Sequence, residues 1–454
     1  MPRLTGDCLK DHGESGERLR PLHPAIPPPA TRPLLSTLLQ APQALARGPL
    51  KALILLTITH MPPANPRRHR VAIVLGTRPE AIKLAPVIHA MGRRPDLFEP
   101  VVITTSQQRE MLAQAMHAFK LTADIDLGLT HANQTLAGFT SRALIALTDA
   151  FRRTRPDLLL VQGDTSTVIA AALAAFYNGV PIGHVEAGLR SGDIRRPFPE
   201  EVNRRMASCV TDIHFAPTER ARENLLAERV ADEHIYVTGN TIVDALRCIR
   251  HDGIFDDETL NAFPWDKKQV ILATIHRREN LGQNLRNVCA AFRRLVELHP
   301  GVEIVIPVHL NPFVREIVFP ELSGVKGITL LEPLEYPDMI EVMRRAVLVL
   351  TDSGGIQEEA PAMHQPVLIL RSVTERPEVV ESGFGKLVGT DRDMIVDEAS
   401  HLLTDPVAHR AMTSGGNPFG DGHAAERIVE IVAERFRIGR LFAAPLVDAP
   451  VPQH

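Results

Sequence analysis

The sequence predicts an α/β protein in which two Rossmann-like domains face each other across a central cleft. Its 454 residues exceed what one hydrophobic core usually covers, so two domains are expected. From residue 70 onwards, short apolar runs alternate with segments of helical periodicity, which is typical of parallel sheets covered by helices. The series starts again after Trp265, which indicates two similar halves.

Six apolar runs in the first half predict strands over residues 71–75, 100–104, 158–161, 182–185, 213–216 and 235–237. The segments between them predict helices over residues 80–92, 107–118, 134–152, 166–178, 200–208 and 218–227. We assign residues 67–240 to this N-terminal domain.

The second half repeats the pattern, with strands predicted over residues 270–273, 303–308, 328–331, 347–350 and 367–370. Its predicted helices cover residues 284–298, 312–319, 336–345, 354–363 and 393–403. We assign residues 241–423 to this C-terminal domain. A last helical pattern follows the Gly- and Pro-rich stretch 415–422. By analogy with the glycosyltransferase-B architecture, we expect residues 424–440 to pack back on the first domain.

Residues 1–66 differ in composition from the rest of the chain. They hold twelve of its 36 prolines, and no acidic residue occurs between Glu17 and Glu80. The apolar run 50–58 is too short to span a bilayer. We expect this segment to be a disordered or non-native extension, with Met61 as an alternative start of the chain.

The composition excludes several classes of function. A net charge of −4 gives no general attraction to nucleic acid or to acidic membranes, so any anion must be bound locally. With 4% aromatic residues and a single tryptophan, a stacking surface for single-stranded nucleic acid is not expected. The four cysteines are widely spaced and form no C-x-x-C pair, which fits a protein of the reducing cytoplasm.

Two turns are expected to bind phosphate. The first lies between the strand at 71–75 and the next helix, where Arg78 and Lys83 add positive charge to a helix N-terminus. It is neither a dinucleotide fingerprint nor a Walker A loop. The second is formed by Ser353, Gly354 and Gly355, small residues that open a helix and let the backbone approach a diphosphate. Arg376, in a neighbouring loop, could pair with phosphate oxygens.

Three carboxylates are predicted at the edge of the first sheet. Asp164 and Glu186 follow two strands, and Glu200 lies in a third loop. Two such carboxylates close in space can raise each other's pKa and so divide into a proton donor and a base. Taken alone, each is better explained as a helix N-cap or a salt-bridge partner, and Asp164, which precedes Thr165, could simply cap the following helix.

Two histidines are expected at the cleft from the opposite domain. His276 ends the strand near 270–275 and could hydrogen-bond or protonate a phosphate, and His309 occupies the matching end of the next strand. A metal site formed by these two residues and His184 is disfavoured, because they lie on separate elements without ligand-type spacing.

Eight ordered motifs between about residues 70 and 440 resemble the non-hydrolysing UDP-N-acetylglucosamine 2-epimerase family. They are VLGTRPEAIKLAP (74–86), QGDTST (162–167), HVEAGLRS (184–191), PFPEEVNR (197–204), HRREN (276–280), PVHLNP (307–312), TDSGGIQEEAP (351–361) and TERPE (374–378). The resemblance implies reversible inversion at C2 of UDP-N-acetylglucosamine by elimination and re-addition of UDP, in a cytoplasmic homodimer that serves polysaccharide synthesis. It requires no metal or redox cofactor.

The resemblance also implies roles for residues. Asp164, Glu186 and Glu200 would act as acids and bases, and His276 would ease departure of the phosphate. The substrate-binding set would be Arg78, Lys83, His309, Ser353, Gly354, Gly355, Glu359 and Arg376, with Glu359 on the ribose diol.

Four other functions remain open at the level of sequence. They are a glycosyltransferase of the same fold, a hydrolysing epimerase, an epimerase for a UDP-diacetamido uronic acid, and a catalytically inactive nucleotide-sugar sensor. The three carboxylates argue against a transferase and a sensor, and no fused kinase domain accompanies this chain as it often does in hydrolysing epimerases.

Overall fold

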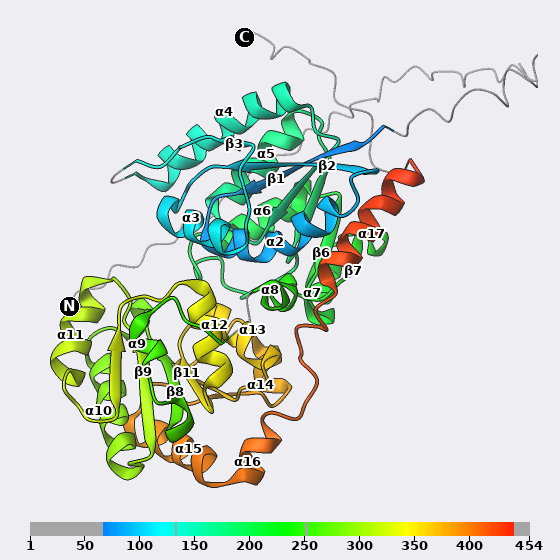
Figure 1. Cartoon of the computed structure of the whole chain (residues 1–454). Helices are drawn as coiled ribbons and strands as arrows, with labels where there is room; N and C mark the ends of the chain where they lie inside the picture. The colour runs from blue at the N-terminus through cyan, green and yellow to red at the C-terminus, as the bar shows by residue number, and fades with distance from the viewer. Residues whose placement is uncertain (1–66, 132–133, 250–252, 440–454) are drawn as a thin grey trace, which may run out of the picture. The chain divides into compact units, whose positions relative to one another are not determined.

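The computed structural model describes residues 67–131, 134–249 and 253–439 (Figure 1). The expectations for residues 1–66, including the alternative start at Met61, lie outside these residues. The fold class is confirmed: two parallel sheets, one of seven strands and one of six, are each covered by helices on both faces.

The first sheet has the order β3-β2-β1-β4-β5-β6-β7. Its order reverses between β1 and β4, and a ligand crevice is expected outside the carboxyl ends of the strands at such a switch point. The strands are β1 (His69–Leu75), β2 (Phe98–Thr104), β3 (Ile125–Asp126), β4 (Leu158–Gln162), β5 (Ile182–Val185), β6 (Ile213–Ala216) and β7 (Ile235–Val237).

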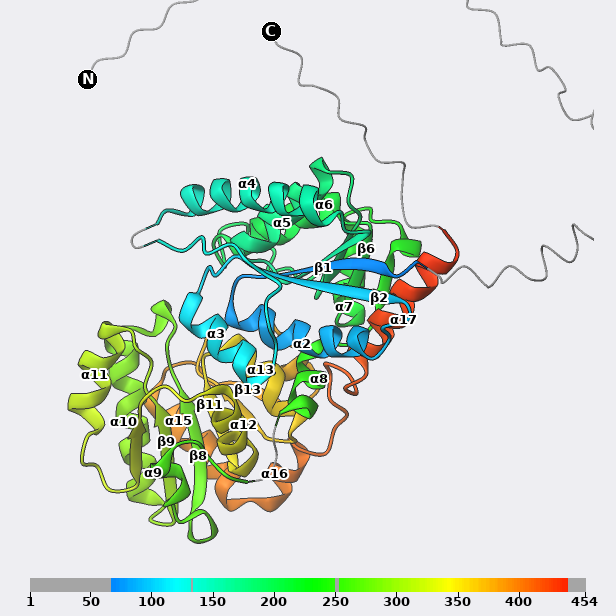
Figure 2. The same cartoon turned by 45° about the horizontal axis from the view of Figure 1, so that its top comes forward.

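Alternation along β1 explains the two layers of helices around this sheet. Val71, Ile73 and Leu75 share a hydrophobic cluster with the helix that follows β1, whereas Ala72 and Val74 belong to a second cluster on the opposite face. Figure 2 shows the two layers on either side of β1 and β2. One layer includes α2 (Arg78–Gly92) and α3 (Arg109–Ala118); the other has α4 (Leu136–Thr154), α5 (Ser166–Tyr177) and α6 (Glu200–Val210).

The second sheet has the order β10-β9-β8-β11-β12-β13, with its switch point between β8 and β11. Its strands are β8 (Gln269–Thr274), β9 (Val302–Pro307), β10 (Ile328–Leu331), β11 (Leu348–Thr351), β12 (Val367–Ile369) and β13 (Gly385–Leu387). The main helices are α10 (Gln283–Leu298), α11 (Pro312–Leu322), α12 (Tyr336–Arg345), α13 (Gly354–Ala362), α14 (Pro377–Glu381), α15 (Arg392–Thr404) and α16 (Pro406–Ala411).

One hydrophobic cluster is shared by the two halves. It contains Leu75 of β1 and Leu272 of β8, and it includes side chains of α8 (Thr241–Cys248), α12 and α13. A separate cluster fills the opposite face of the second sheet, where Ile271 and Ala273 face α10. The carboxyl ends of both sheets are therefore held near one another by packed side chains.

The last helix, α17 (Ala424–Arg437), contacts α2 and α8 of the first half. Ile428 and Val432 belong to the same apolar cluster as α2. Asp244 of α8 accepts hydrogen bonds from the first backbone N–H groups of α17, at 2.8 Å from Ala425. The chain thus returns to the first half after completing the second sheet.

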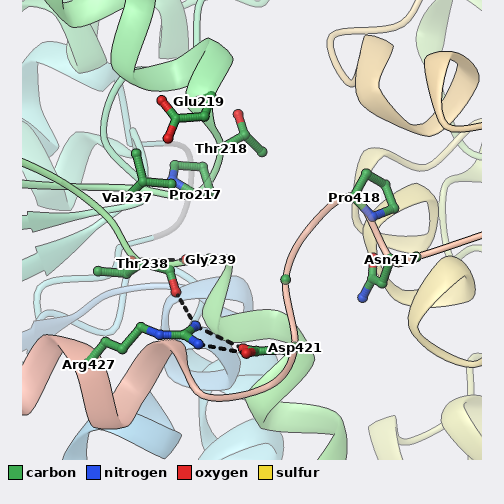
Figure 3. Close-up of a pocket in the computed structure, with 12 residues that line it drawn as sticks. Pro217, Thr218, Glu219, Val237, Thr238, Gly239, Asn417, Pro418, Asp421 and Arg427 are labelled. Carbon is green, nitrogen blue, oxygen red and sulfur yellow. Dashed lines mark hydrogen bonds and ion pairs between the residues drawn. The ribbon is translucent and has the colours of Figure 1, made fainter.

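A cavity lies where the chain makes this return (Figure 3). Arg427 of α17 donates hydrogen bonds to the carboxylate of Asp421 and, at 3.0 Å, to the carbonyl oxygen of Thr238. Gly239 and Gly420 both have positive φ angles, and a Cβ on Gly420 would lie 3.2 Å from the Cα of Gly239. The two crossings between the halves therefore pass each other at glycines.

Most predicted elements agree with the observed ones to within about two residues. The sequence missed β3, β13 and α8, together with α7 (Glu219–Ala227) only in its first residue. It also proposed no helix within residues 241–268, where the structure has α8 and the short helix α9 (Glu258–Asn261). No helix among the described residues is both long enough and apolar enough to cross a membrane.

Candidate active site

The turn between β1 and α2 is held by the buried carboxylate of Glu80. It accepts hydrogen bonds from the backbone N–H groups of Gly76 and Thr77, the latter at 2.8 Å, and from the hydroxyl of Thr165. Burial raises the pKa of Glu80 to about 7, although these hydrogen bonds lower it. Glu80 thereby joins the β1–α2 turn to the β4–α5 turn, which carries Asp164.

Gly76 is required by the close approach of these two turns. A Cβ on this residue would lie 2.0 Å from Oγ1 of Thr167 and 2.7 Å from Oγ1 of Thr105. Any side chain would therefore push the β4–α5 turn away from the start of α2.

Arg78 and Lys83 of α2 both contact the second half. The guanidinium carbon of Arg78 lies 5.6 Å from the centre of the Tyr336 ring, at the start of α12. Lys83 is buried; its Nζ contacts the carboxylate of Glu186 and lies 2.8 Å from Oε2 of Glu358 in α13. The first predicted phosphate turn thus faces the second half, and its lysine is already paired with two carboxylates.

Asp164 follows β4 but does not cap α5. The N-cap is Thr165, whose hydroxyl accepts a hydrogen bond from the backbone N–H of Val168. The helix-cap explanation of Asp164 is therefore wrong. Its carboxylate pairs with Arg204 of α6, a buried cation that the sequence analysis did not identify.

Glu200 begins α6 on the same side of the sheet. Burial raises its pKa, and the negative charge of Asp164 raises it further, while Arg204 and Arg277 lower it. Asp164 is therefore close enough for its charge to alter the pKa of Glu200. Arg277, a cation of the second half, also acts on that pKa.

Glu186 directly follows β5, in a backbone conformation with φ of 61°. Its carboxylate accepts hydrogen bonds from Lys83 and, at 2.9 Å, from the side-chain amide of Gln162. Burial raises its pKa, and the nearby charge of Glu358 also raises it. The sequence predicted mutual raising by Asp164 and Glu186. The structure instead gives each carboxylate its own cation and places Glu358 as the second carboxylate on Lys83.

His276 lies just beyond β8 and is fixed by Asp352. Asp352 is fully buried beyond β11 and accepts hydrogen bonds from the backbone N–H groups of His276 and Arg277, at 3.1 and 3.0 Å. The Nδ1 atom of His276 lies 3.1 Å from the same carboxylate, and Asn280 donates to it at 2.9 Å. Burial favours a raised pKa for Asp352, but these donors outweigh it and lower the pKa.

His309 stacks on His276, with ring centroids 5.5 Å apart and an interplanar angle of 23°. Burial lowers its pKa, and so does the neighbouring His276. His184 lies elsewhere, buried in β5 with Nε2 2.7 Å from the carbonyl oxygen of Gly163. Within residues 67–131, 134–249 and 253–439, no group of three or more His, Cys, Asp or Glu side chains could hold a metal ion.

The N-terminus of α13 meets two guanidinium groups. Ser353 is its N-cap, and a Cβ on Gly354 would lie 3.3 Å from Cζ of Arg376 and 3.4 Å from Nη2 of Arg277. Glu375 pairs with both arginines, at 3.2 and 3.0 Å. We call Ser353, Gly354, Arg277 and Arg376 the anion cradle, because helix N–H groups and two cations converge there.

Two further site residues lie at the edges of this cradle. Gly355, the second residue of α13, is exposed, and a Cβ there would still be 3.9 Å from Oγ of Ser353. Glu359 lies one turn further along α13 and accepts a hydrogen bond from the hydroxyl of Tyr336 at 3.0 Å. Burial raises the pKa of Glu359 to about 7.

Sequence reasoning missed three polar residues that hold the site together, Arg204, Asp352 and Glu375, and it missed the pairing role of Glu358. Asp352 could have been found, because it follows a strand just as Asp164 does. The role of Glu358 could not, since its partner Lys83 is 275 positions away in the chain.

Fold and site first define a class: an α/β protein of glycosyltransferase-B architecture in which an anion cradle lies opposite buried carboxylates. A solved glycosyltransferase from Rickettsia africae ESF-5 shares this fold, with a TM-score of 0.51 and 10% identity over 82% of this chain and 99% of its own. The sequence profile of one family matches residues 89–433, and the chain belongs to that family, the UDP-N-acetylglucosamine 2-epimerases.

Relatives agree with this assignment. The UDP-N-acetylglucosamine 2-epimerase of Bacillus subtilis strain 168 is 47% identical over 364 residues, which are 80% of this chain and 95% of the relative. The structure of the Neisseria meningitidis UDP-GlcNAc 2-epimerase bound to UDP-GlcNAc has a TM-score of 0.74 and 42% identity. It covers 80% of this chain and all of its own.

Proposed function

We propose that this protein interconverts UDP-N-acetylglucosamine and UDP-N-acetylmannosamine by eliminating and re-adding UDP. One observation carries the proposal: buried Lys83, in the helix that follows β1, joins the carboxylate of Glu186 at the end of β5 to α13, the helix that forms the anion cradle. A diphosphate in the cradle would hold its sugar against Glu186. The Neisseria relative was solved with UDP-GlcNAc, which is the substrate we assign here.

The chemistry requires elimination because the C2 proton of the sugar is not acidic enough for simple removal. In our proposal the electron pair of the C2–H bond forms the C1=C2 double bond of a glycal, while the electron pair of the C1–O bond leaves with UDP. The proton goes to a carboxylate. Asp164, Glu186 and Glu200 are the candidates, and re-protonation from the opposite face of C2 needs a second one of them. The raised pKa values of Glu186 and Glu200 suit groups that exchange protons near neutral pH.

The nucleotide would be held mainly by the second half. Ser353, Gly354, Gly355 and Arg376 would bind the diphosphate, and Glu359 the ribose diol. Arg78 and Lys83 would reach it from the first half, and His309 would line the same edge of the second sheet. These assignments rest on the helix N-terminus, the two guanidinium groups and the burial of Glu359.

His276 would ease the departure of the phosphate. Asp352 lies next to Nδ1 of His276, so a neutral ring would carry its proton on Nδ1 and leave Nε2 as an acceptor. A doubly protonated ring would donate a hydrogen bond from Nε2. A hydrogen bond or proton donated there would stabilise the negative charge that develops on the leaving UDP.

We further propose that residues 67–240 form the acid/base domain, residues 241–423 the UDP-binding domain and residues 424–440 a helix that belongs to the first domain. We also propose a cytoplasmic homodimer that supplies surface polysaccharide synthesis. The outer helices of the first half offer an apolar surface for a second copy, since Ile145 of α4 and Tyr177 of α5 are 65% and 62% exposed.

Incubation with UDP-N-acetylglucosamine in D₂O, followed by NMR, tests the proposal. We expect UDP-N-acetylmannosamine carrying deuterium at C2. Release of free N-acetylmannosamine would contradict the re-addition of UDP, and product that keeps its original hydrogen at C2 would contradict the proposed proton transfer from and to C2. An unchanged substrate would contradict the function itself.

A further inference from the structure

Glu358 lies at a position that the substrate-binding and acid/base roles do not use. It is in the second turn of α13, the helix whose N-terminus forms the anion cradle, and its side chain is 1% exposed. Its Oε1 accepts a hydrogen bond from Nε of Arg376 at 2.8 Å, and its Oε2 lies 2.8 Å from Nζ of Lys83. One carboxylate thus contacts a cation of the cradle and a cation of the first half.

These contacts form a chain of alternating charge, Glu186–Lys83–Glu358–Arg376, which we call the charge chain. Its four side chains are between 1% and 14% exposed. Water screens such charges poorly, so a change at one end alters the energy of the other end more than it would at the surface. Further charged or polar groups border it. Gln162 contacts Glu186, Glu375 contacts Arg376, and Glu359 and Tyr336 lie near Glu358, with Arg78 over the Tyr336 ring.

We propose that Glu358 is a positioning residue that couples binding of a diphosphate in the anion cradle to the proton affinity of Glu186. This inference rests on the proposed function of the same site. Glu358 itself touches neither the sugar nor the diphosphate; it acts through Lys83 and Arg376.

The direction of the coupling follows from the signs of the charges. A bound diphosphate shares the positive charge of Arg376, so the negative charge of Glu358 is neutralised less. The ion pair between Glu358 and Lys83 then becomes stronger, so Lys83 stabilises the anionic form of Glu186 less. The pKa of Glu186 rises, and the carboxylate becomes a stronger base when a nucleotide is present. The added negative charge of the diphosphate acts in the same direction.

Proton uptake on binding UDP measures this coupling without any turnover. A ligand that raises a pKa makes the protein take up protons near that pKa. Isothermal titration calorimetry in buffers of different ionisation enthalpy counts those protons. We expect Glu358→Gln to take up fewer protons than the unsubstituted protein, because its Lys83 stays paired with Glu186 whether or not Arg376 is engaged.

The pH dependence of turnover gives the second readout. In Glu358→Gln, Lys83 has one carboxylate left, so the pKa of Glu186 falls and the acid limb of kcat should move to lower pH by about one unit. Turnover at neutral pH should fall about tenfold or more, because Glu186 becomes a weaker base. Glu358→Asp keeps the charge and should restore part of both effects.

Glu375→Gln is the matched control. Glu375 contacts Arg376 and Arg277 but not Lys83. Its amide should alter the affinity for UDP, but it should shift the acid limb of kcat and the proton uptake less than Glu358→Gln does, because Glu375 reaches Lys83 only through Arg376 and Glu358. Equal shifts in Glu358→Gln and Glu375→Gln would overturn the coupling through Lys83, and so would the absence of a shift in folded Glu358→Gln.

Failure of this inference can be told from failure of the proposed function. If the unsubstituted protein does not bind UDP or epimerise the substrate, the function is wrong. If it does both and Glu358→Gln has the same proton uptake and pH profile, only the coupling is wrong. Thermal unfolding establishes that each variant is folded. If Glu358→Gln fails to fold, Glu358→Met, which also removes the charge, takes its place in the same two assays, and an unchanged response there would also overturn the coupling.

Discussion

Asp352 holds His276 by both its backbone and its side chain: the backbone N–H and Nδ1 of His276 each lie 3.1 Å from the same buried carboxylate. The arrangement orients the imidazole. It also connects the ends of β8 and β11, the two strands at the second switch point.

Replacing Asp352 with Asn should therefore lower turnover more than nucleotide binding. The amide keeps the size of the side chain, but it cannot accept a hydrogen bond from every donor around it. We therefore expect kcat to fall about 10²-fold or more, while the affinity for UDP changes only a few-fold. Steady-state kinetics and UDP titration measure the two effects separately.

Asp338→Asn is a control for the burial of this carboxylate. Asp338 is also buried in the second half and accepts two backbone hydrogen bonds at 2.9 Å, from Asp256 and Asp257, but it contacts no proposed site residue. Both variants should lose stability. A comparable loss of kcat in the two would show that Asp352 acts only on folding.

Amide substitutions at the three carboxylates should separate proton transfer from binding. In Asp164→Asn, Glu186→Gln and Glu200→Gln we expect turnover to fall by about 10²–10⁴-fold, the usual contribution of general acid–base catalysis, with UDP affinity within a few-fold. Arg376→Ala should instead weaken UDP binding first. Deuterium incorporation at C2 and UDP titration are the measurements. An amide variant that exchanges C2 at the normal rate would remove that carboxylate from the mechanism.

Gly76→Ala should destabilise the protein strongly, because the new Cβ would lie 2.0 Å from Oγ1 of Thr167. Overpacking typically costs about 1–3 kcal/mol, and this contact is closer than most. Gly92, at the other end of α2, is the matched control: a Cβ there would meet nothing within 4 Å. Gly92→Ala should be neutral or slightly stabilising. Urea denaturation compares the two, and equal midpoints would refute the close approach of the turns.

Stability should depend on pH through Glu80. Its pKa is raised from 4.5 to about 7 by burial, so the folded protein keeps a proton that the unfolded chain releases between these values. The free energy of unfolding should therefore decrease as pH rises from about 4.5 to about 7, by a few kcal/mol at most. Glu80→Gln cannot titrate and should show a shallower dependence over that range. Urea midpoints at several pH values test this, and identical slopes would contradict it.

The sequence by itself determined the fold class and the position of most elements. Runs such as residues 182–185 and 213–216 have the length and composition of buried parallel strands, and the structure places strands at those residues. β3 and β13 escaped prediction because Ile125–Asp126 and Gly385–Leu387 each include a charged residue, whereas the equally short β7 and β12 are wholly apolar runs and were predicted. The motifs likewise indicated which turns carry the candidate site residues.

Only the tertiary structure decided how those residues pair. The sequence could not show that Asp164 pairs with Arg204, that Asp352 holds His276, or that Glu186 and Glu358 share Lys83. The physical reason is that local pattern records which side of an element is buried, whereas an ion pair depends on the distance between atoms that folding brings together. Lys83 and Glu358 lie in different halves of the chain. Their 2.8 Å contact forms only because the carboxyl ends of the strands in the two sheets face each other in the folded protein.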